Sequence, residues 1–329
     1  MKLLEVNDLH IGLTTPRGPA EAVRGISFSL ERGETLGIVG ESGCGKSITV
    51  MSLMGLLPGS AKVSGSIRFD GQELVGLPEK AMCGIRGNRI GMIFQEPMTA
   101  LNPVHTIARQ VGEPLRIHRG LTKAEARQEA LALLERVGIP DAASRLDAYP
   151  HQFSGGQRQR IGIAMALACG PDLLIADEPT TALDVTIQKQ ILDLIQSLVA
   201  ERGMALILIS HDLGVIASSV RRMLVMYGGS IVESGPTGAV FAERAHPYTK
   251  GLFAARPALG APRGQRLATI PGSVPELVDL PPGCPFAGRC RYTADACHGT
   301  RPAPSMLPHD HAVRCLRLDE IAAESEATA

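Results

Sequence analysis

Short apolar segments separated by polar turns dominate the first 39 residues. The segments LLEV, ISFSL and TLGIV are typical of strands. Residues 64–69 form another such segment, and the Asp70-Gly71 pair that follows it favours a hairpin turn. This part of the chain therefore predicts an antiparallel β subdomain.

Further along the chain, strand-like and helical patterns alternate. Apolar runs typical of buried strands occur at residues 90–94, 173–176, 205–209 and 222–226. A helix is predicted over residues 46–57, where Pro58-Gly59 would end it. Strands that alternate with helices predict an α/β fold with a mostly parallel sheet covered on both faces.

Two stretches depart from this alternation. Residues 97–169 have a helical pattern, and the segment TKAE at 122–125 fits a capping box that begins a helix ending near residue 137. Beyond residue 240, Pro and Cys become frequent and regular periodicity fades. We therefore predict a first domain at 1–240 with an all-helical insertion at about 97–169, and a small extension at 241–329. The acidic end of this extension, residues 320–329, is expected to fray.

Composition narrows the function classes. With 44% hydrophobic and 20% charged residues the chain can form a core, and its 33 basic and 33 acidic residues leave no net charge. A neutral chain is not expected to have nucleic acid or an anionic membrane surface as its main partner. No apolar stretch reaches the roughly 18 residues of a membrane span. The N-terminal MKLLEVNDLH lacks the apolar region of a signal peptide, and seven cysteines, an odd number, indicate a reducing compartment.

The strongest chemical signal is the segment GESGCGKS between the strand TLGIV and a predicted helix. It fits the P-loop pattern, in which backbone amides and a helix N-terminus surround a phosphate that glycines allow to approach. Lys46 would supply a positive charge to the β- and γ-phosphates, and the Ser47 hydroxyl would be a ligand of Mg²⁺. Cys44 is interpreted as a filler rather than a reactive thiol. The predicted nucleotide-binding residues are Gly40, Glu41, Ser42, Gly43, Cys44, Gly45, Lys46 and Ser47.

Two carboxylates follow the strand predicted at 173–176. Asp177 and Glu178 come at its carboxyl end, the edge at which open α/β sheets bind ligands. Asp177 is suited to lie in the second shell of groups around Mg²⁺, and Glu178 is placed to polarise an attacking water. Together with the P-loop, this pair predicts a nucleotide hydrolase.

The rarer string FSGGQRQR at 153–160 narrows the family. Its serine begins an apolar helix, so the string forms a second helix N-terminus directed at an anion. FSGGQ resembles the LSGGQ signature of the ATP-binding subunits of ABC transporters. Gln95 is similar to their Q-loop glutamine, the segment TALD at 181–184 to their D-loop, and His211 to their switch histidine. The chain resembles this family over roughly residues 1–240, which implies an ABC-type P-loop NTPase core.

This resemblance implies a role for each matching residue. Glu178 would be the general base, His211 would hold the γ-phosphate and the attacking water, and Gln95 would sense the γ-phosphate and Mg²⁺. Asp184 would contact a second ATPase subunit, expected to be a paralogue arranged head to tail. The residues expected to contact ATP bound by that subunit are Ser154, Gly155, Gly156 and Gln157. One position departs from the family: the aromatic residue that stacks on adenine corresponds to Leu13, so no stacking residue is assigned.

The extension resembles, more narrowly, the ATPases of oligopeptide, dipeptide and nickel importers. It carries HPYTK at 246–250, a Pro-rich segment, and four clustered cysteines: Cys284, Cys290, Cys297 and Cys315. Four thiols in a reducing compartment favour metal ligation over disulfides. All-thiolate ligation suits a 4Fe-4S cluster, which related importer ATPases carry. The alternatives are zinc, with His298, His309 or His311 as a further ligand, and no metal.

The expected function is ATP hydrolysis that energises an importer of dipeptides or oligopeptides. The resemblance implies two transmembrane permease subunits, an extracytoplasmic substrate-binding protein, and a peripheral location on the cytoplasmic face of the inner membrane. A nickel or other small-solute importer is the alternative within the family. A soluble ABC protein acting on DNA or ribosomes fits less well, because the chain has a single cassette and no heptad run. A small-molecule kinase leaves FSGGQ, Gln95 and His211 unexplained.

Overall fold

Contacts divide the chain into two units built from interleaved segments. The computed structural model describes residues 1–95, 100–181, 183–255 and 269–327. The first unit contains residues 1–4, 29–35 and 68–210, and the second contains residues 5–28, 36–67 and 211–329. The domain boundary near residue 240 stays a prediction. In the described parts of the chain, no helix is long and apolar enough to cross a membrane.

The first unit contains three parallel strands, β6 (Ile90–Ile93), β7 (Leu173–Asp177) and β8 (Ala205–Ile209). Leu173 pairs with Ile90 on one side and with Ala205 on the other, so β7 lies in the middle. Every residue of the three strands is buried. Continuous burial is the property of a parallel sheet covered on both faces, and it confirms the strands predicted from these apolar runs.

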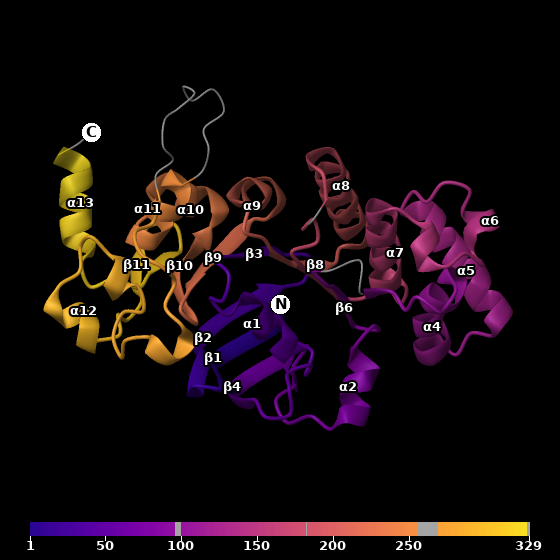
Figure 1. Cartoon of the computed structure of the whole chain (residues 1–329), viewed down its shortest axis with the longest axis horizontal. Helices are drawn as coiled ribbons and strands as arrows, with labels where there is room; N and C mark the ends of the chain where they lie inside the picture. The colour runs from indigo at the N-terminus through magenta and orange to yellow at the C-terminus, as the bar shows by residue number, and fades with distance from the viewer. Residues whose placement is uncertain (96–99, 182, 256–268, 328–329) are drawn as a thin grey trace. The chain divides into compact units, whose positions relative to one another are not determined.

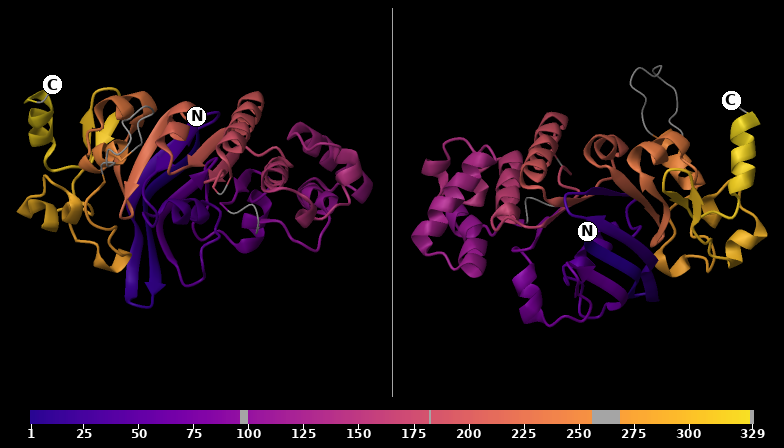
Figure 2. Two further views of the ribbon diagram at one scale, coloured as in Figure 1. Left: turned by 45° about the horizontal axis from the view of Figure 1, so that its top comes forward. Right: turned by 180° about the vertical axis from the view of Figure 1, so that it is seen from behind.

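Four helices of the first unit pack on one another, as Figures 1 and 2 show: α4 (Ile107–Arg119), α5 (Lys123–Arg136), α6 (Ala142–Arg145) and α7 (Gly155–Leu167). Helix α5 begins at the predicted capping box, where the Thr122 hydroxyl accepts from the backbone N–H of Glu125 and the Glu125 carboxylate accepts from that of Thr122. Gly138, at φ 76°, follows its end. These four helices lie within the stretch predicted as a helical insertion, whose bounds stay a prediction, and residues 97–99 of it lie outside the described residues. The unit also contains β5 (Gln72–Glu73), α2 (Glu79–Ile85), a 3₁₀ turn at Pro150–Gln152 and α8 (Val185–Arg202).

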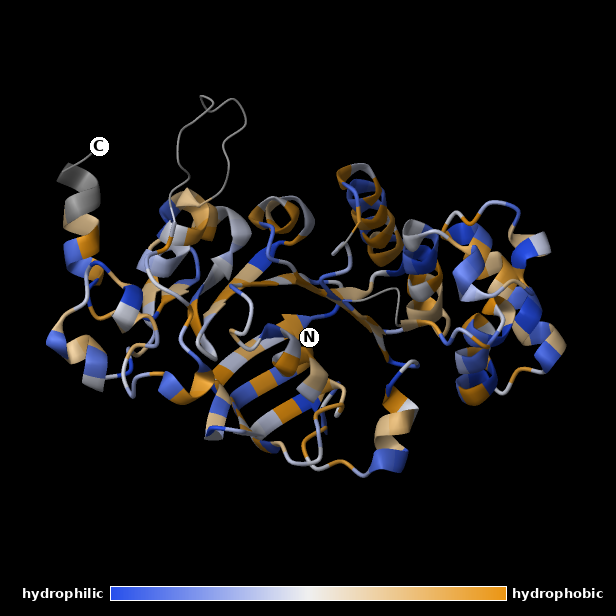
Figure 3. Ribbon diagram, in the orientation of Figure 1, coloured by the Kyte–Doolittle hydropathy of each residue, from blue (hydrophilic) through white to orange (hydrophobic). Residues whose placement is uncertain are grey.

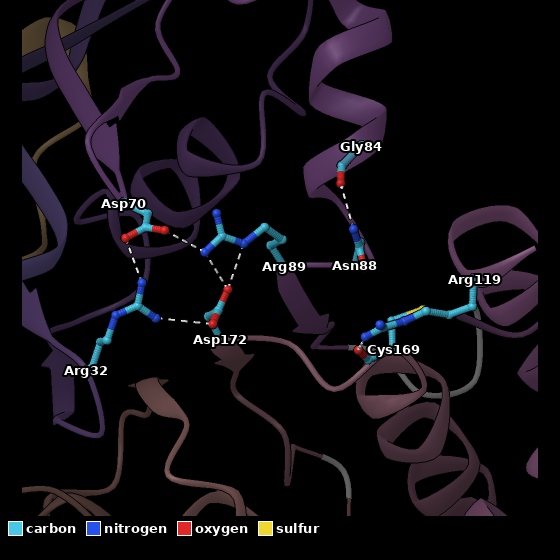
Figure 4. A network of polar contacts seen from close by, with 8 residues as sticks. All are labelled: Arg32, Asp70, Gly84, Asn88, Arg89, Arg119, Cys169 and Asp172. Atoms are coloured by element: carbon cyan, nitrogen blue, oxygen red, sulfur yellow. Dashed lines mark hydrogen bonds and ion pairs between the residues drawn. The ribbon is translucent and has the colours of Figure 1, made fainter.

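Four charged side chains connect the amino end of β7 to two loops of the first unit (Figure 4). Arg89 donates to Asp172 at 2.7 Å and to Asp70 at 2.8 Å. Arg32 donates to Asp70 at 2.6 Å and to Asp172 at 3.2 Å. Each acid thus accepts from both arginines. Asp70, at φ 50°, and Gly71, at φ 81°, form the predicted hairpin turn, across which Phe69 pairs with Gln72.

The second unit contains strands of two sheets. Most of β1 (Lys2–Thr15), β2 (Gly18–Glu31) and β4 (Lys62–Phe69) lies in this unit, in the order β2-β1-β4. These strands are longer than the segments that predict them, and their orange and blue bands in Figure 3 show the alternation of apolar and polar residues. The strands of the second sheet that belong to this unit follow the order β11-β12-β10-β9-β3. They are β3 (Thr35–Val39), β9 (Arg222–Tyr227), β10 (Ser230–Pro236), β11 (Ser305–Leu307) and β12 (His311–Val313).

In this second sheet β3 and β9 are parallel, whereas β9, β10, β12 and β11 pair antiparallel. The C-terminal extension therefore contributes the two strands at one end of this order, β11 at the edge and β12 beside it. The helical elements of the second unit are α1 (Lys46–Leu53), α9 (Leu213–Ser219), α10 (Thr237–Glu243), α11 (Pro247–Ala254), α12 (Asp295–Gly299) and α13 (Leu318–Ala327), with 3₁₀ turns at Leu277–Asp279 and Ala287–Arg289.

Two helix ends differ from the predictions. Helix α1 ends four residues before position 57, because Gly55 adopts φ 58° and the backbone N–H of Leu56 turns back to the carbonyl of Met51. Pro58-Gly59 therefore does not end it. Residues 320–327, predicted to fray, lie in α13, whose first turn carries Asp319 and Glu320, while residues 328–329 lie outside the described residues.

Candidate functional site

The P-loop lies between β3 and α1, and its glycines hold backbone conformations that other residues rarely adopt. Gly40, Gly43 and Gly45 have φ angles of 152°, 80° and 101°. A Cβ atom on Gly40 would lie 2.2 Å from the carbonyl oxygen of Met226, and one on Gly45 would lie 2.7 Å from that of Ala22. Both positions therefore require glycine, and the loop has the shape that a phosphate-binding backbone needs.

Lys46, at the first position of α1, is folded back over this loop. Its side chain is 6% exposed, and its Nζ donates to the carbonyl oxygens of Gly40 at 2.8 Å and of Glu41 at 3.1 Å. The half-buried Ser47 follows it in the first turn of the helix. Cys44 is buried, and burial raises the pKa of its thiol. Burial therefore favours the neutral thiol, and the interpretation of Cys44 as a filler stays a prediction.

His211 and the start of the P-loop line the same cavity of the second unit. The exposed His211 precedes α9, which Asp212 caps by accepting from the backbone N–H of Gly214 at 2.6 Å. The cavity measures about 460 Å³, and its lining includes Gly40, Glu41, His211 and Asp212. The histidine predicted to hold a phosphate and the loop predicted to bind one are thus brought together.

In the first unit, Gln95 and Glu178 are in contact. The Gln95 amide nitrogen donates to Glu178 Oε2 at 3.1 Å, and the Thr181 hydroxyl donates to the same oxygen at 3.0 Å. Asp177 is the buried last residue of β7, so Glu178 stands at the carboxyl end of the strand, as predicted. Its φ of 46° is a left-handed conformation, in which its backbone N–H donates to the carbonyl of Ile209. The carboxylate is therefore held by its backbone and by two donors.

The signature string begins α7 through a second capping box. The Ser154 hydroxyl accepts from the backbone N–H of Gln157 at 3.3 Å, and the Gln157 side chain accepts from that of Ser154 at 3.1 Å. A Cβ atom on Gly156 would lie 2.9 Å from Ile187 of α8, so this glycine permits the close approach of the two helices. Ser154 is exposed at the helix N-terminus, where a helix attracts anions.

Gln159, one turn into α7, is a residue that the sequence reasoning did not select. It is 1% exposed, and its amide donates at 2.6 Å to the carbonyl of Pro179, the residue after Glu178. The signal was present in the sequence, since a glutamine within an apolar helix needs a buried partner. Asp184 also has a local role: it caps α8 by accepting from the backbone N–H of Ile187 at 3.0 Å. Ala182 of the predicted D-loop lies outside the described residues.

The four cysteines of the extension are unpaired and lie near one another. Burial raises the pKa of Cys284 to about 11, and the thiols of Cys315, Cys290 and Cys297 act on it in the same direction. The backbone N–H of Arg317 donates to the sulfur of Cys315 at 3.4 Å. Among the described residues, however, no three His, Cys, Asp or Glu side chains form a group that could hold a metal ion.

This finding does not support the iron–sulfur or zinc site expected on Cys284, Cys290, Cys297 and Cys315. His311, one of the histidines considered for zinc, is engaged elsewhere. Its Nε2 lies 2.7 Å from Glu233 and its Nδ1 lies 3.1 Å from Glu243.

Comparison with known proteins finds two families along the chain. Residues 23–181 match the ABC transporter family, and residues 232–297 match the oligopeptide/dipeptide transporter C-terminal region. The chain is 52% identical over 321 residues to the dipeptide transport ATP-binding protein of Bacillus subtilis. The aligned region covers 97% of this chain and 96% of that protein. It is 49% identical over 306 residues to the oligopeptide transport ATP-binding protein of Salmonella typhimurium, covering 93% and 91% of the two chains.

Solved structures of ATP-binding cassettes are also similar. One is a dimeric cassette in a post-hydrolysis state bound to ADP and Pi, with a TM-score of 0.64 and 27% identity over 71% of this chain and 98% of that one. Another is cbiO1 from Clostridium perfringens, part of an ABC transporter complex, with a TM-score of 0.62 and 30% identity over 74% and 92% of the two chains.

Proposed function

Since this chain belongs to the ABC transporter family, we propose that it couples ATP hydrolysis at the residues described above to the import of peptides. It is an ATP-binding and ATP-hydrolysing subunit of a transporter. The observation that carries peptide import is the identity of about half of its residues, over nearly its full length, with dipeptide and oligopeptide transport ATP-binding proteins.

The P-loop is the proposed phosphate site. Its glycines bring backbone N–H groups together at the N-terminus of α1, where they bind phosphate oxygens. Lys46 exchanges its two carbonyl partners for the β- and γ-phosphates when ATP binds, since an ammonium gains more from an anion than from a neutral acceptor. The Ser47 hydroxyl, the Gln95 amide and the Asp177 carboxylate are oxygen ligands of the kind that Mg²⁺ prefers. Bound Mg²⁺ would neutralise charge on the transferred phosphate.

Glu178 is the proposed general base. The donors Gln95 and Thr181 orient its carboxylate, the group that accepts a proton from water. His211, exposed beside the P-loop cavity, holds the γ-phosphate and the attacking water. Gln95 thus has two proposed tasks, because it contacts the base and senses the γ-phosphate.

The second anion-directed helix N-terminus, at α7, indicates a dimer. Ser154, Gly155, Gly156 and Gln157 contact the ATP bound by a second ATPase subunit arranged head to tail, and Asp184 contacts that subunit nearby. The exposed position of Ser154 and Asp184 supports this assignment. ATP-dependent dimerisation of Glu178→Gln, measured by light scattering, tests it. A Ser154→Arg change should prevent the dimer, whereas Ser144→Arg, on an exposed residue of α6, should not.

Peptide import requires other proteins besides this ATPase subunit. Two transmembrane permease subunits form the channel, an extracytoplasmic substrate-binding protein delivers the peptide, and the chain lies at the cytoplasmic face of the inner membrane. The test is reconstitution of the chain with these partners in proteoliposomes. ATP hydrolysis should rise when the binding protein carries a dipeptide or an oligopeptide, with accumulation of the peptide. A response to nickel alone would favour the nickel importer, and hydrolysis indifferent to all partners would favour a soluble ABC ATPase.

A 4Fe-4S cluster on the four cysteines stays a prediction. Its support is the all-thiol donor set and the N–H group donated to Cys315. Purification without oxygen, followed by iron and sulfide assays, is the test. About four irons per chain would establish the cluster, zinc in equimolar amount would favour the alternative, and folded protein free of metal would refute both.

A further inference from the structure

An arginine of the C-terminal extension contacts the P-loop. Arg289 Nη1 donates to Glu41 Oε2 at 2.7 Å, and Nη2 donates to Oε1 at 3.2 Å. Glu41 is the second residue of GESGCGKS, and 248 positions separate it from Arg289. The pair is bidentate, which is the strongest geometry for an arginine and a carboxylate. The Arg289 side chain is 7% exposed, so solvent and salt screen the contact only weakly.

A tyrosine of the extension holds the backbone of the same residue. The backbone N–H of Glu41 donates at 2.7 Å to the hydroxyl oxygen of Tyr248, which is fully buried. The carbonyl of Glu41 in turn accepts from Lys46 Nζ at 3.1 Å. Glu41 therefore has three polar groups in contact: its carboxylate with Arg289, its N–H with Tyr248, and its carbonyl with the lysine of the nucleotide site.

Both contacting residues are rigidly held. Tyr248 lies in α11, where His246 caps the helix by accepting from the Tyr248 N–H at 3.1 Å. The ring of Tyr248 packs at 4.6 Å from that of Tyr227 and at 5.4 Å from that of Phe286. In a chain with seven Phe, four Tyr and no Trp, this gathering of aromatic rings beside the P-loop is a specific feature.

Arg289 is positioned by the loop between Cys284 and Cys290. It ends the 3₁₀ turn Ala287–Arg289, whose first N–H donates to the carbonyl of Cys284 at 3.1 Å. Its Nε donates to the carbonyl of Pro271 at 2.8 Å, and its guanidinium lies over the ring of Tyr227. The extension thus fixes the stem of the side chain and directs the charged end to Glu41.

We propose that Arg289 and Tyr248 are positioning residues of the nucleotide site, through which the C-terminal extension sets the affinity for ATP. Arg289 neutralises a carboxylate that would otherwise repel the triphosphate from the P-loop, and Tyr248, by accepting from the Glu41 N–H, holds the first turn of the P-loop in the conformation that receives phosphate. Neither residue belongs to the P-loop motif itself. This inference rests on the proposed role of the P-loop as the phosphate site.

The test compares nucleotide affinity and kinetics in the full-length protein. We expect Arg289→Ala to raise the Kd for a non-hydrolysable ATP analogue, and the KM for ATP, by about tenfold, the size expected for one uncompensated charge near a bound phosphate. The kcat at saturating ATP should stay within about twofold, because Arg289 does not contact the reacting atoms. Arg289→Lys keeps the charge and should recover most of the affinity. Arg291→Ala removes the same charge two residues away and should leave the Kd unchanged.

A double-mutant cycle isolates the pair. In a Glu41→Gln background there is no carboxylate to neutralise, so the further change Arg289→Ala should alter the Kd by less than about twofold. Additive effects of the two changes, or an Arg289→Ala protein with the affinity of the wild type, would overturn the proposal.

Two further variants keep the outcome decisive. Should Arg289→Ala fail to fold, Tyr248→Phe removes only a hydroxyl from the aromatic cluster and is expected to raise the Kd severalfold, whereas unchanged affinity in this variant would also overturn the proposal. Lys46→Ala distinguishes a failure of the positioning role from a failure of the phosphate-site assignment. If Lys46→Ala loses affinity and neither extension variant does, the positioning role is wrong; if Lys46→Ala also retains affinity, the assignment of the P-loop as the phosphate site is wrong.

Discussion

The side-chain amide of Gln95 donates a 3.1 Å hydrogen bond to the carboxylate of Glu178. The two residues follow neighbouring parallel strands, β6 and β7, at the ends where ligands of such sheets bind. The contact joins the proposed γ-phosphate sensor directly to the proposed base. A change at Gln95 should therefore alter the protonation of Glu178 as well as the binding of nucleotide.

Gln95→Glu tests this coupling. It places a second carboxylate beside Glu178, and a like charge raises the pKa of a carboxyl group. The variant also loses the amide donor and adds negative charge beside the phosphate site, so kcat at pH 7 should fall more than about tenfold, and the acidic limb of the kcat profile should move to higher pH. Gln128→Glu adds the same charge on an exposed residue of α5 and should leave the profile unchanged. An unshifted profile in Gln95→Glu would contradict the coupling.

Replacement of the base itself should separate binding from turnover. Glu178→Gln keeps the shape of the side chain but cannot accept a proton from water, so kcat should fall by at least about 100-fold. The Kd for ATP should remain within about threefold, because the P-loop is intact. Steady-state hydrolysis and an equilibrium titration measure the two quantities. Glu201→Gln, on an exposed residue of α8, is the control, and an unchanged kcat in Glu178→Gln would refute the assignment.

Lys46→Ala should instead weaken binding. The change removes the ammonium that Gly40 and Glu41 hold over the P-loop, so the β- and γ-phosphates would lose their charged partner. We expect the Kd for ATP to rise by at least about tenfold in a titration with the purified protein. Lys80→Ala removes a lysine from the exposed side of α2 and should bind as the wild type does. Undiminished binding by Lys46→Ala would count against the site.

The charged network around Asp70 predicts a pH dependence of stability. Hydrogen bonds from Arg89 and Arg32 lower the pKa of Asp70 below its ordinary value. A carboxyl group with a lowered pKa in the folded state stabilises the protein above the pKa of the unfolded chain, near 4, and this contribution is lost as the pH falls through the folded-state pKa. The urea midpoint should therefore decrease below about pH 4.

Asp70→Asn should make this decrease shallower, because asparagine does not titrate and tolerates the left-handed conformation of the turn. Asp193→Asn removes the same charge from an exposed position of α8, outside the network, and should leave the slope as in the wild type. Equal slopes in the Asp70→Asn variant and the wild type between pH 5 and pH 2 would show that Asp70 contributes nothing to acid stability.

Local structure follows closely from the sequence, because it depends on neighbouring residues. The capping box at Thr122, the hairpin at Asp70-Gly71 and the apolar strands are each encoded in fewer than about ten consecutive positions. The same holds for the P-loop and the signature helix, where glycines and a helix N-terminus are adjacent in the chain. Helix α1 is shorter than predicted because a positive φ at Gly55 ends it before the proline that marks the loop.

By itself, the sequence determined which residues are suited to bind and hydrolyse a nucleotide, because P-loop, acidic pair and signature are contiguous motifs. The tertiary structure decided which of them touch. Gln95 meets Glu178 across 83 positions, and Arg289 meets Glu41 across 248. Such contacts arise from burial and the pairing of charges between distant segments, and no local pattern records them. For the same reason the spacing of four cysteines suggests a metal site, while the placement and protonation of their thiols depend on the packing around them.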